Sequence, residues 1–186
     1  IRLGEKVSAQ IDASRRQGIR RAHSATHLLH SALRKVLGDH AEQQGSKVDD
    51  DWLRFDFTNP QAVKSDELVE IERDANARIL ESAAVVAKDM PLIEARKTGA
   101  TMLFGEKYPD VVRVISMGDF SKELCGGTHL DNTAQVGLLK IVSEESVASG
   151  TRRIVALTGR KAMEHIRSHE QALHQAAVAL RTSPEE

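Results

Sequence analysis

The clearest pattern along the chain is the strict alternation of apolar and polar residues from Trp52 to Thr58. Leu53, Phe55 and Phe57 fall on one side of this segment, and charged residues lie between them. A strand with one buried face has this period of two residues. The segment is therefore predicted to be a half-buried β-strand that ends before Pro60.

Apolar residues follow a helical period in two other parts of the chain. Residues 22–37 are predicted to form an amphipathic helix that ends at Gly38. The apolar stripe of this helix consists of Ala25, Leu28, Leu29, Ala32, Leu33 and Val36. A second helix is predicted after Ser65, which we expect to act as its N-cap. Its buried face is predicted to consist of Leu68, Ile71, Ala75 and Ile79.

The remaining segments are shorter and of both kinds. Further strands are predicted at 7–12, 84–87, 111–117, 137–143 and 153–158, and further helices at 91–99 and 160–181. On the last helix, the residues available for packing are Ala162, Ile166, Leu173, Ala176, Ala177 and Leu180. Strands and helices do not alternate regularly, and several strands are close together in the C-terminal half. This order favours an α+β domain with a mostly antiparallel sheet.

Composition narrows the classes of protein that fit. The net charge of the 186 residues is −1, which argues against a uniformly basic nucleic-acid binder. Contacts with a polyanion would have to come from local basic clusters, and each cluster could equally be a solvated surface. These clusters are Arg15, Arg16, Arg20 and Arg21, then Arg152 and Arg153, then Arg160 and Lys161. The single cysteine excludes an internal disulfide, and no stretch approaches the about 20 apolar residues of a membrane helix. We therefore expect a cytoplasmic location without a membrane partner.

Two pairs of possible metal ligands stand far apart in the sequence. His23 and His27 have the spacing of one helical turn, and Cys125 and His129 flank a glycine-rich turn. Together they offer three nitrogens and one sulfur, a set that a tetrahedral Zn²⁺ site accepts. The alternative is a buried thiol beside a tight turn. Four protein ligands would make a closed structural site and three would leave a position for water, and the sequence leaves both open.

Other histidines show how little one pair means by itself. His165 and His169 have the same spacing on the predicted terminal helix, but no cysteine loop accompanies them, and we interpret them as exposed. His30 and His40 are interpreted as structural or surface residues. No glutamate lies between His23 and His27, which argues against a metalloprotease helix.

Six longer strings surround these ligands. They are His-Ser-Ala-Thr-His-Leu-Leu-His at 23–30, Gln-Gly-Ser at 44–46, Leu-Arg-Phe-Asp-Phe at 53–57, Leu-Phe-Gly-Glu-Lys-Tyr at 103–108, Glu-Leu-Cys-Gly-Gly-Thr-His at 123–129 and Thr-Arg-Arg-Ile at 151–154. With these strings the chain resembles the editing domain of alanyl-tRNA synthetase, from about Arg21 to Thr158. The related editing domain of threonyl-tRNA synthetase usually carries proline where Thr128 stands here, which favours the alanyl branch.

The resemblance implies a division of the chain and an origin. Residues 1–20 resemble the end of a preceding barrel-like domain, residues 21–159 the editing domain, and residues 160–186 a helix that leads towards the synthetase's C-terminal region. We therefore expect an excised part of the full synthetase, with a free-standing trans-editing deacylase as the alternative. The ATP-dependent ligase activity would belong to the parent chain, because no glycine-rich phosphate loop is present here.

The activity that the resemblance implies is hydrolysis of mischarged tRNA(Ala) that carries serine or glycine. An alanine pocket cannot strongly reject an added hydroxyl, so a second site must cleave the wrong ester. The resemblance, with the ligands above, implies Zn²⁺ as cofactor, and the acceptor end of tRNA(Ala) and the rest of the synthetase as partners. An oligomer through the C-terminal region is also expected.

The resemblance also implies substrate-contacting residues. Thr26 is predicted to hydrogen-bond the serine hydroxyl, and Gln43 to line the pocket. Gly126 and Gly127 are predicted to present backbone amides to the ester or the terminal ribose. The alternative for Thr26 is a helix residue bonded to its own backbone. Zinc could activate a reacting group or only hold the pocket. The competing classes are a non-catalytic zinc module that binds tRNA and a plain interaction domain that docks through its terminal helix.

Overall fold

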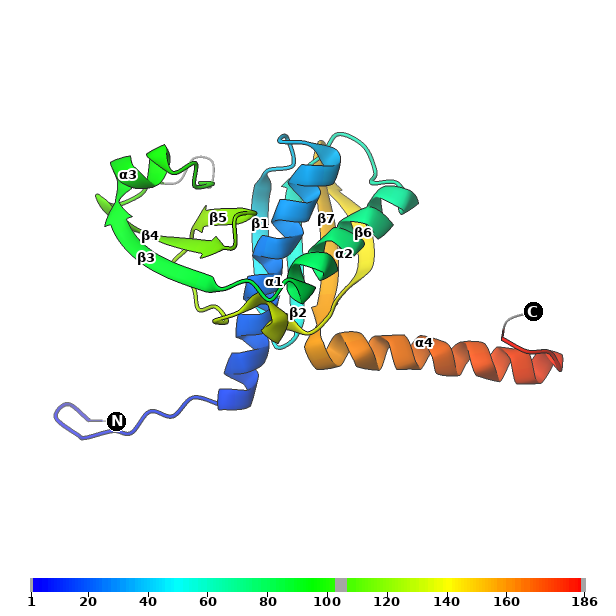
Figure 1. Cartoon of the computed structure of the whole chain (residues 1–186). Coiled ribbons are helices and arrows are strands. Elements are labelled where there is room, and N and C mark those ends of the chain that lie inside the picture. Colours follow the sequence, from blue (N-terminus) through cyan, green and yellow to red (C-terminus); the bar gives the residue numbers. More distant parts are fainter. Residues whose placement is uncertain (1, 103–106, 185–186) are drawn as a thin grey trace.

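The structure is a computed structural model that describes residues 2–102 and 107–184 (Figure 1). Its elements in chain order are α1 (Ala13–Leu37), β1 (Gln43–Asp49), β2 (Trp52–Thr58), α2 (Ser65–Leu80), β3 (Val85–Pro91), α3 (Leu92–Lys97), β4 (Val111–Met117), β5 (Ser121–Leu124), the 3₁₀ turn η1 (Thr133–Val136), β6 (Leu139–Ala148), β7 (Thr151–Thr158) and α4 (Gly159–Leu180). The strand ladders of the described chain are all antiparallel. The predicted α+β class with mostly antiparallel pairing is confirmed.

Two separate sheets divide the strands. The larger sheet has the order β1-β2-β7-β6, and the smaller one has the order β3-β4-β5. In the larger sheet, Phe55 pairs with Ile154, and Leu53 pairs with Ala156. The side chains of Leu53, Phe55 and Phe57 are all fully buried, which confirms the alternating strand predicted at 52–58.

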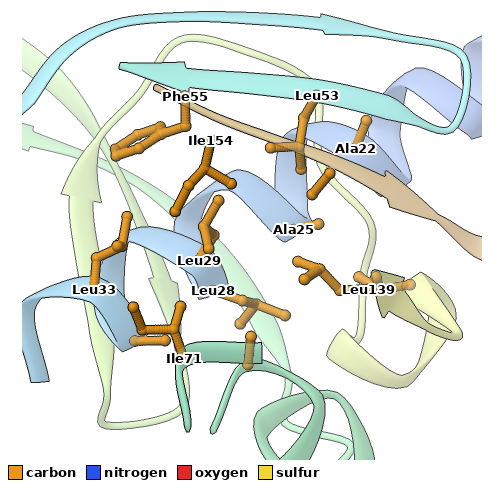
Figure 2. Packing of buried hydrophobic residues seen from close by; sticks show 14 of the residues in the cluster. Ala22, Ala25, Leu28, Leu29, Leu33, Leu53, Phe55, Ile71, Leu139 and Ile154 are labelled. Atoms are coloured by element: carbon orange, nitrogen blue, oxygen red, sulfur yellow. The ribbon is translucent and has the colours of Figure 1, made fainter. Parts of the chain in front are cut away.

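The main core lies between the larger sheet and the helices α1 and α2. Figure 2 shows Leu53 and Phe55 of β2 and Ile154 of β7 gathered against the apolar face of α1. Ile71 of α2 closes the cluster from the other side of α1. The strands and α2 contribute five labelled side chains to this cluster, and all five are fully buried: Leu53, Phe55, Ile71, Leu139 and Ile154. This packing fixes α1, the helix that carries His23 and His27.

Helix α1 is longer than predicted at its N-terminal end. It begins at Ala13, where the side chain of Asp12 caps it by accepting a 2.9 Å hydrogen bond from the Arg15 amide. The prediction started at residue 22 because the apolar stripe starts there. The first turns are rich in arginine and lack the apolar period. The predicted end is confirmed, since Gly38 caps the helix with a φ of 111°.

The strand predicted at residues 7–12 is wrong, because residues 5–12 form neither helix nor strand. Val7 and Ile11 are largely exposed, and no strand of the described chain pairs with this segment. Alternation over so few residues cannot define a strand when no partner accepts its backbone hydrogen bonds. The N-cap prediction for Ser65 is also wrong. Lys64 is the cap residue, and its amide donates a 2.9 Å hydrogen bond to Glu67.

The other predicted elements are present. The strand predicted at 111–117 has the same bounds in the structure, and the others differ at one or both ends. The strand predicted at 84–87 continues to Pro91, and the one predicted at 137–143 continues to Ala148. The sequence did not predict β1, β5 or η1. Strand β1 has Val48 as its single large apolar residue, and β5 has only four residues, so neither carries a hydrophobic period.

Helix α4 extends away from the rest of the molecule in Figure 1. Of its apolar side chains predicted to pack, Ala162 and Ala177 are buried, whereas Leu173 and Leu180 are mostly exposed. None of the described helices combines the length and the apolar character needed to cross a bilayer.

Candidate metal centre

His23, His27, Cys125 and His129 meet at one point in the structure, and we call this group the His/Cys cluster. Their ligand atoms all lie within 4.8 Å of one another. Cys125 Sγ is 3.4 Å from His23 Nε2 and 3.3 Å from His129 Nε2. The two histidines on α1 are one turn apart, and the loop after β5 brings Cys125 and His129 to them.

Hydrogen bonds hold that loop against α1 and β4. Arg113 on β4 donates through Nη1 to the carbonyl oxygens of Cys125, at 3.1 Å, and Gly127, at 2.6 Å. Ser24 on α1 lies between the two halves of the site: its Oγ is 3.3 Å from His129 Nδ1 and accepts a 3.1 Å hydrogen bond from the Leu130 amide. These contacts fix the imidazole of His129 in place, as a metal ligand requires.

Gly127 lies directly against the ring of His23 on α1. A Cβ atom added at Gly127 would lie 2.0 Å from Cε1 of His23. Only glycine therefore leaves room for the His23 ring at its observed position. Gly126 differs, because a Cβ there would meet nothing within 4 Å.

Glu123 is the main site residue that the sequence analysis missed. Its carboxylate has one oxygen 2.8 Å from His27 Nδ1 and the other 2.9 Å from His30 Nδ1. A signal was present, since residues two apart in a strand point to the same face and Glu123 is two residues before Cys125. That signal could be used only if β5 had been predicted. His30 is buried, which fits its interpretation as a structural residue.

The charges of these groups are strongly coupled. Burial raises the pKa of the Cys125 thiol, but the imidazoles of His129, His23 and His27 outweigh it and lower that pKa to about 3. Burial lowers the pKa of His27, but the Glu123 carboxylate and Cys125 outweigh it and raise that pKa to about 10. Burial opposes ionisation of Glu123, yet His27 and His30 hold its pKa well below the ordinary value. Cys125 is thus a thiolate at neutral pH, the form that binds metals.

His129 behaves in the opposite way to His27. Burial lowers its pKa to about 4, and the neighbouring charges of His27 and His23 add to that effect. Its imidazole is therefore neutral at pH 7, as a metal ligand must be. The Nε2 atom of His27 is buried and has no hydrogen-bond partner in the described part of the chain. An orphaned buried nitrogen beside a thiolate and two more imidazoles fits a metal ion, so the cluster could hold one.

Three residues of the His/Cys cluster, His23, His27 and Cys125, line a cavity of about 400 Å³. The other lining residues include Thr26 of α1, Gln43 of β1, Val112 of β4 and Gly126. Thr26 Oγ1 donates a 2.9 Å hydrogen bond to the Ala22 carbonyl, as the backbone-bonded alternative described. Gln43 Nε2 donates to Ser46 Oγ at 3.2 Å, which leaves its amide oxygen for another donor.

The remaining candidates lie apart from this cavity. The rings of His165 and His169 contact each other on α4, with centroids 4.2 Å apart. Several arginines of the basic clusters are paired with carboxylates: Arg15 with Asp49, Arg21 with Asp51, Arg152 with Glu144 and Arg153 with Asp56. The structure therefore offers less unpaired basic surface than the sequence clusters suggest.

The fold and the cluster place the chain among α+β proteins with a possible metal centre beside a cavity. Comparison with known proteins identifies its relatives. Residues 112–155 match the family described as threonyl and alanyl tRNA synthetase second additional domain. The alanine–tRNA ligase of Acetivibrio thermocellus is 55% identical over 184 residues, which is 99% of this chain and 21% of that protein. The alanine–tRNA ligase of Rhodopirellula baltica is 56% identical over 173 residues, which is 93% of this chain and 18% of that protein. The alanine–tRNA ligase of Janthinobacterium sp. is 48% identical over the whole chain and 21% of that protein.

These findings confirm the predicted resemblance: the chain is an alanyl-tRNA synthetase editing-domain-like protein. It spans about a fifth of the length of these relatives. Of the strings that carried the resemblance, the one at 103–108 falls largely outside the described residues.

Proposed function

We propose that this chain hydrolyses the ester bond of mischarged tRNA(Ala) and removes serine or glycine, as the editing part of an alanyl-tRNA synthetase. The observation that carries the proposal is the His/Cys cluster in the wall of a cavity of about 400 Å³. That volume lies within the range of small-ligand sites, about 300–1,000 Å³, and it suits an aminoacyl group with part of its ribose. Its partners would be the acceptor end of tRNA(Ala) and the remainder of the synthetase.

His23, His27, Cys125 and His129 would hold zinc in this site. Zinc bound there would supply a Lewis acid for a substrate oxygen or for water. The four donors also suit a closed site, in which the metal fixes α1 to the loop after β5 and thereby shapes the cavity. Gln43 Oε1 would orient water or the substrate amine by accepting a hydrogen bond from it.

Thr26 supports recognition of serine. Its single hydroxyl proton is engaged by the Ala22 carbonyl, so towards the cavity Oγ1 is an acceptor. The hydroxyl of a seryl ester would donate to it, whereas alanyl and glycyl esters have no such donor. Thr26 is therefore proposed to favour cleavage of the seryl ester over the alanyl ester. Cleavage of the glycyl ester would need another basis.

The test is deacylation of purified Ser-tRNA(Ala), Gly-tRNA(Ala) and Ala-tRNA(Ala). We expect cleavage of the first two and slow cleavage of the third. Removal of zinc, or His27→Ala, should abolish the activity, because either change dismantles the cluster. Thr26→Val should lower kcat/KM about 10- to 100-fold for the seryl ester and little for the glycyl ester.

A matched control is His169→Ala, which alters a histidine on α4 away from the cavity and should leave all rates unchanged. Full turnover by a metal-free preparation would contradict the proposal. Binding of zinc and tRNA without any ester cleavage would favour the non-catalytic zinc module instead, a reading that the four-donor set also supports.

A further inference from the structure

The carboxylate of Glu123 is almost enclosed, and two imidazoles share it. Only 12% of its side chain is exposed, against 7% for His27 and 2% for His30. Oε1 makes a 2.9 Å hydrogen bond with His30 Nδ1, and Oε2 lies 2.8 Å from His27 Nδ1. His30 does not belong to the His/Cys cluster. It is therefore a buried histidine that the proposed metal site does not itself use.

A carboxylate bound in this way selects which nitrogen of each ring carries a proton. Ionised carboxylate oxygens only accept hydrogen bonds, so the facing Nδ1 atoms must be the protonated ones. When His27 binds a metal it would give up the proton on Nε2, and the lone pair is then on this buried atom, which makes no hydrogen bond within the described part of the chain. Metal-bound histidines commonly rest on an acceptor of this kind, which fixes the tautomer and the ring orientation.

His30 gives Glu123 its own fixed position. It follows His27 by nearly one turn of α1, and its ring packs on Phe55 with centroids 5.2 Å apart. Without His30, Oε1 of a buried carboxylate would lose its hydrogen bond, and the side chain would turn or take up water. The core strand β2, through Phe55, thus supports His30, and His30 supports Glu123.

We propose that Glu123 and His30 are positioning residues for His27, and that they set the affinity and geometry of metal binding through its Nε2 atom. This inference rests on the proposed metal site. It assigns no direct metal contact to either residue. It predicts that zinc affinity depends on a hydrogen-bond donor in the side chain of residue 30 and not on the size of that side chain.

The test measures the Kd of zinc by competition with a chromogenic chelator, using the full chain. Glu123→Gln and His30→Leu should weaken zinc binding about 10- to 100-fold. His30→Asn places an amide donor near the position of Nδ1 and should restore the affinity to within about threefold of the original chain. The visible spectrum of the Co²⁺-substituted chain should change in the first two variants and not in the third, because that spectrum reports ligand geometry.

His169→Leu on the exposed part of α4 is the matched control and should behave as the original chain does. If His30→Leu does not fold, Glu123→Gln and His30→Asn still decide the question. An unchanged zinc Kd and Co²⁺ spectrum in a folded Glu123→Gln variant would overturn the inference. The proposed function would stand in that case, because it is tested separately, by cleavage of the mischarged ester by the original chain with and without zinc.

Discussion

At the scale of single residues, the site depends on the space and the hydrogen-bond acceptors that some residues leave unused, as well as on the contacts that they make. The absence of a side chain at Gly127 leaves room for the ring of His23. The hydroxyl of Thr26 donates a hydrogen bond to the Ala22 carbonyl, so its oxygen can accept one from the cavity. Glu123 uses both oxygens on imidazoles. Each is defined by a neighbour that is remote in the sequence or one helical turn away.

At this scale we expect Gly127→Ala to displace His23. The added methyl group would overlap the imidazole, so the ring must leave the cluster, and zinc binding should weaken by at least about tenfold. Gly126→Ala adds the same methyl group in open space on the neighbouring residue and is the control. Equal zinc affinities of the two variants would show that the close approach at residue 127 does not matter.

The sequence pointed to the four residues that meet in the His/Cys cluster, but not to the residues that hold them in place. His23 and His27 follow from helical spacing, and Cys125 and His129 from a glycine-rich turn. Arg113 and Ser24 could not be predicted, because their role comes from tertiary contacts with loop carbonyls and with His129. No local pattern encodes such contacts.

Whole elements show the same division between local and tertiary information. Strand β2 was predicted with its observed bounds because apolar and polar residues alternate strictly along it. Strand β1 was missed because its mostly polar sequence shows no such alternation. Strand β1 forms by pairing with β2, and the turn between them brings buried Asp51 to Arg21 of α1 and Thr158 at the start of α4. A single turn thus ties together three elements far apart in the sequence.

The pairing of β2 with β7 should make stability depend on pH. A hydrogen bond from Arg153, opposed by burial and helped by the arginine charges, lowers the pKa of Asp56. That pKa is then below the unfolded value of about 3.9, so ionised Asp56 stabilises the fold above this pH, and the contribution disappears as pH falls through the folded pKa.

Urea unfolding of the metal-free chain can detect this effect. Asp56→Asn should lower the free energy of unfolding by about 1 kcal/mol at pH 7 and by less at pH 3. Glu170→Gln on the exposed part of α4 should change it at neither pH. An equal loss for Asp56→Asn at both values would show that its charge does not contribute.

For the molecule as a whole, the fold class followed from the order of the elements, and the arrangement into two sheets did not. The strand at β5 was not predicted, so the smaller sheet and the cavity between the two sheets could not be inferred. The sequence also did not predict that α4 extends away from the rest of the molecule, because the spacing of its apolar residues is that of a helix packed along one face.

Metal binding should stabilise the entire fold. The cluster joins α1 to the loop after β5, and an unfolded chain does not hold these four side chains together. At a zinc concentration about a thousandfold above Kd, folding gains about 4 kcal/mol, which raises Tm by roughly 10 °C for a chain of this size. Thermal unfolding followed by circular dichroism, with zinc or with a chelator, measures the difference.

Cys125→Ser is the control for that measurement. It replaces a thiolate by a weak ligand, so most of the zinc-dependent rise in Tm should vanish. A rise of equal size in this variant would mean that zinc stabilises the chain from another place.

The distance along the chain between the two halves of the cluster has a consequence for biosynthesis. When the ribosome has released α1, only two imidazoles are available, and they bind zinc weakly. The remaining thiolate and imidazole emerge about a hundred residues later. Tight retention of the ion therefore begins only after the β1–β2 hairpin and helix α2 have been made.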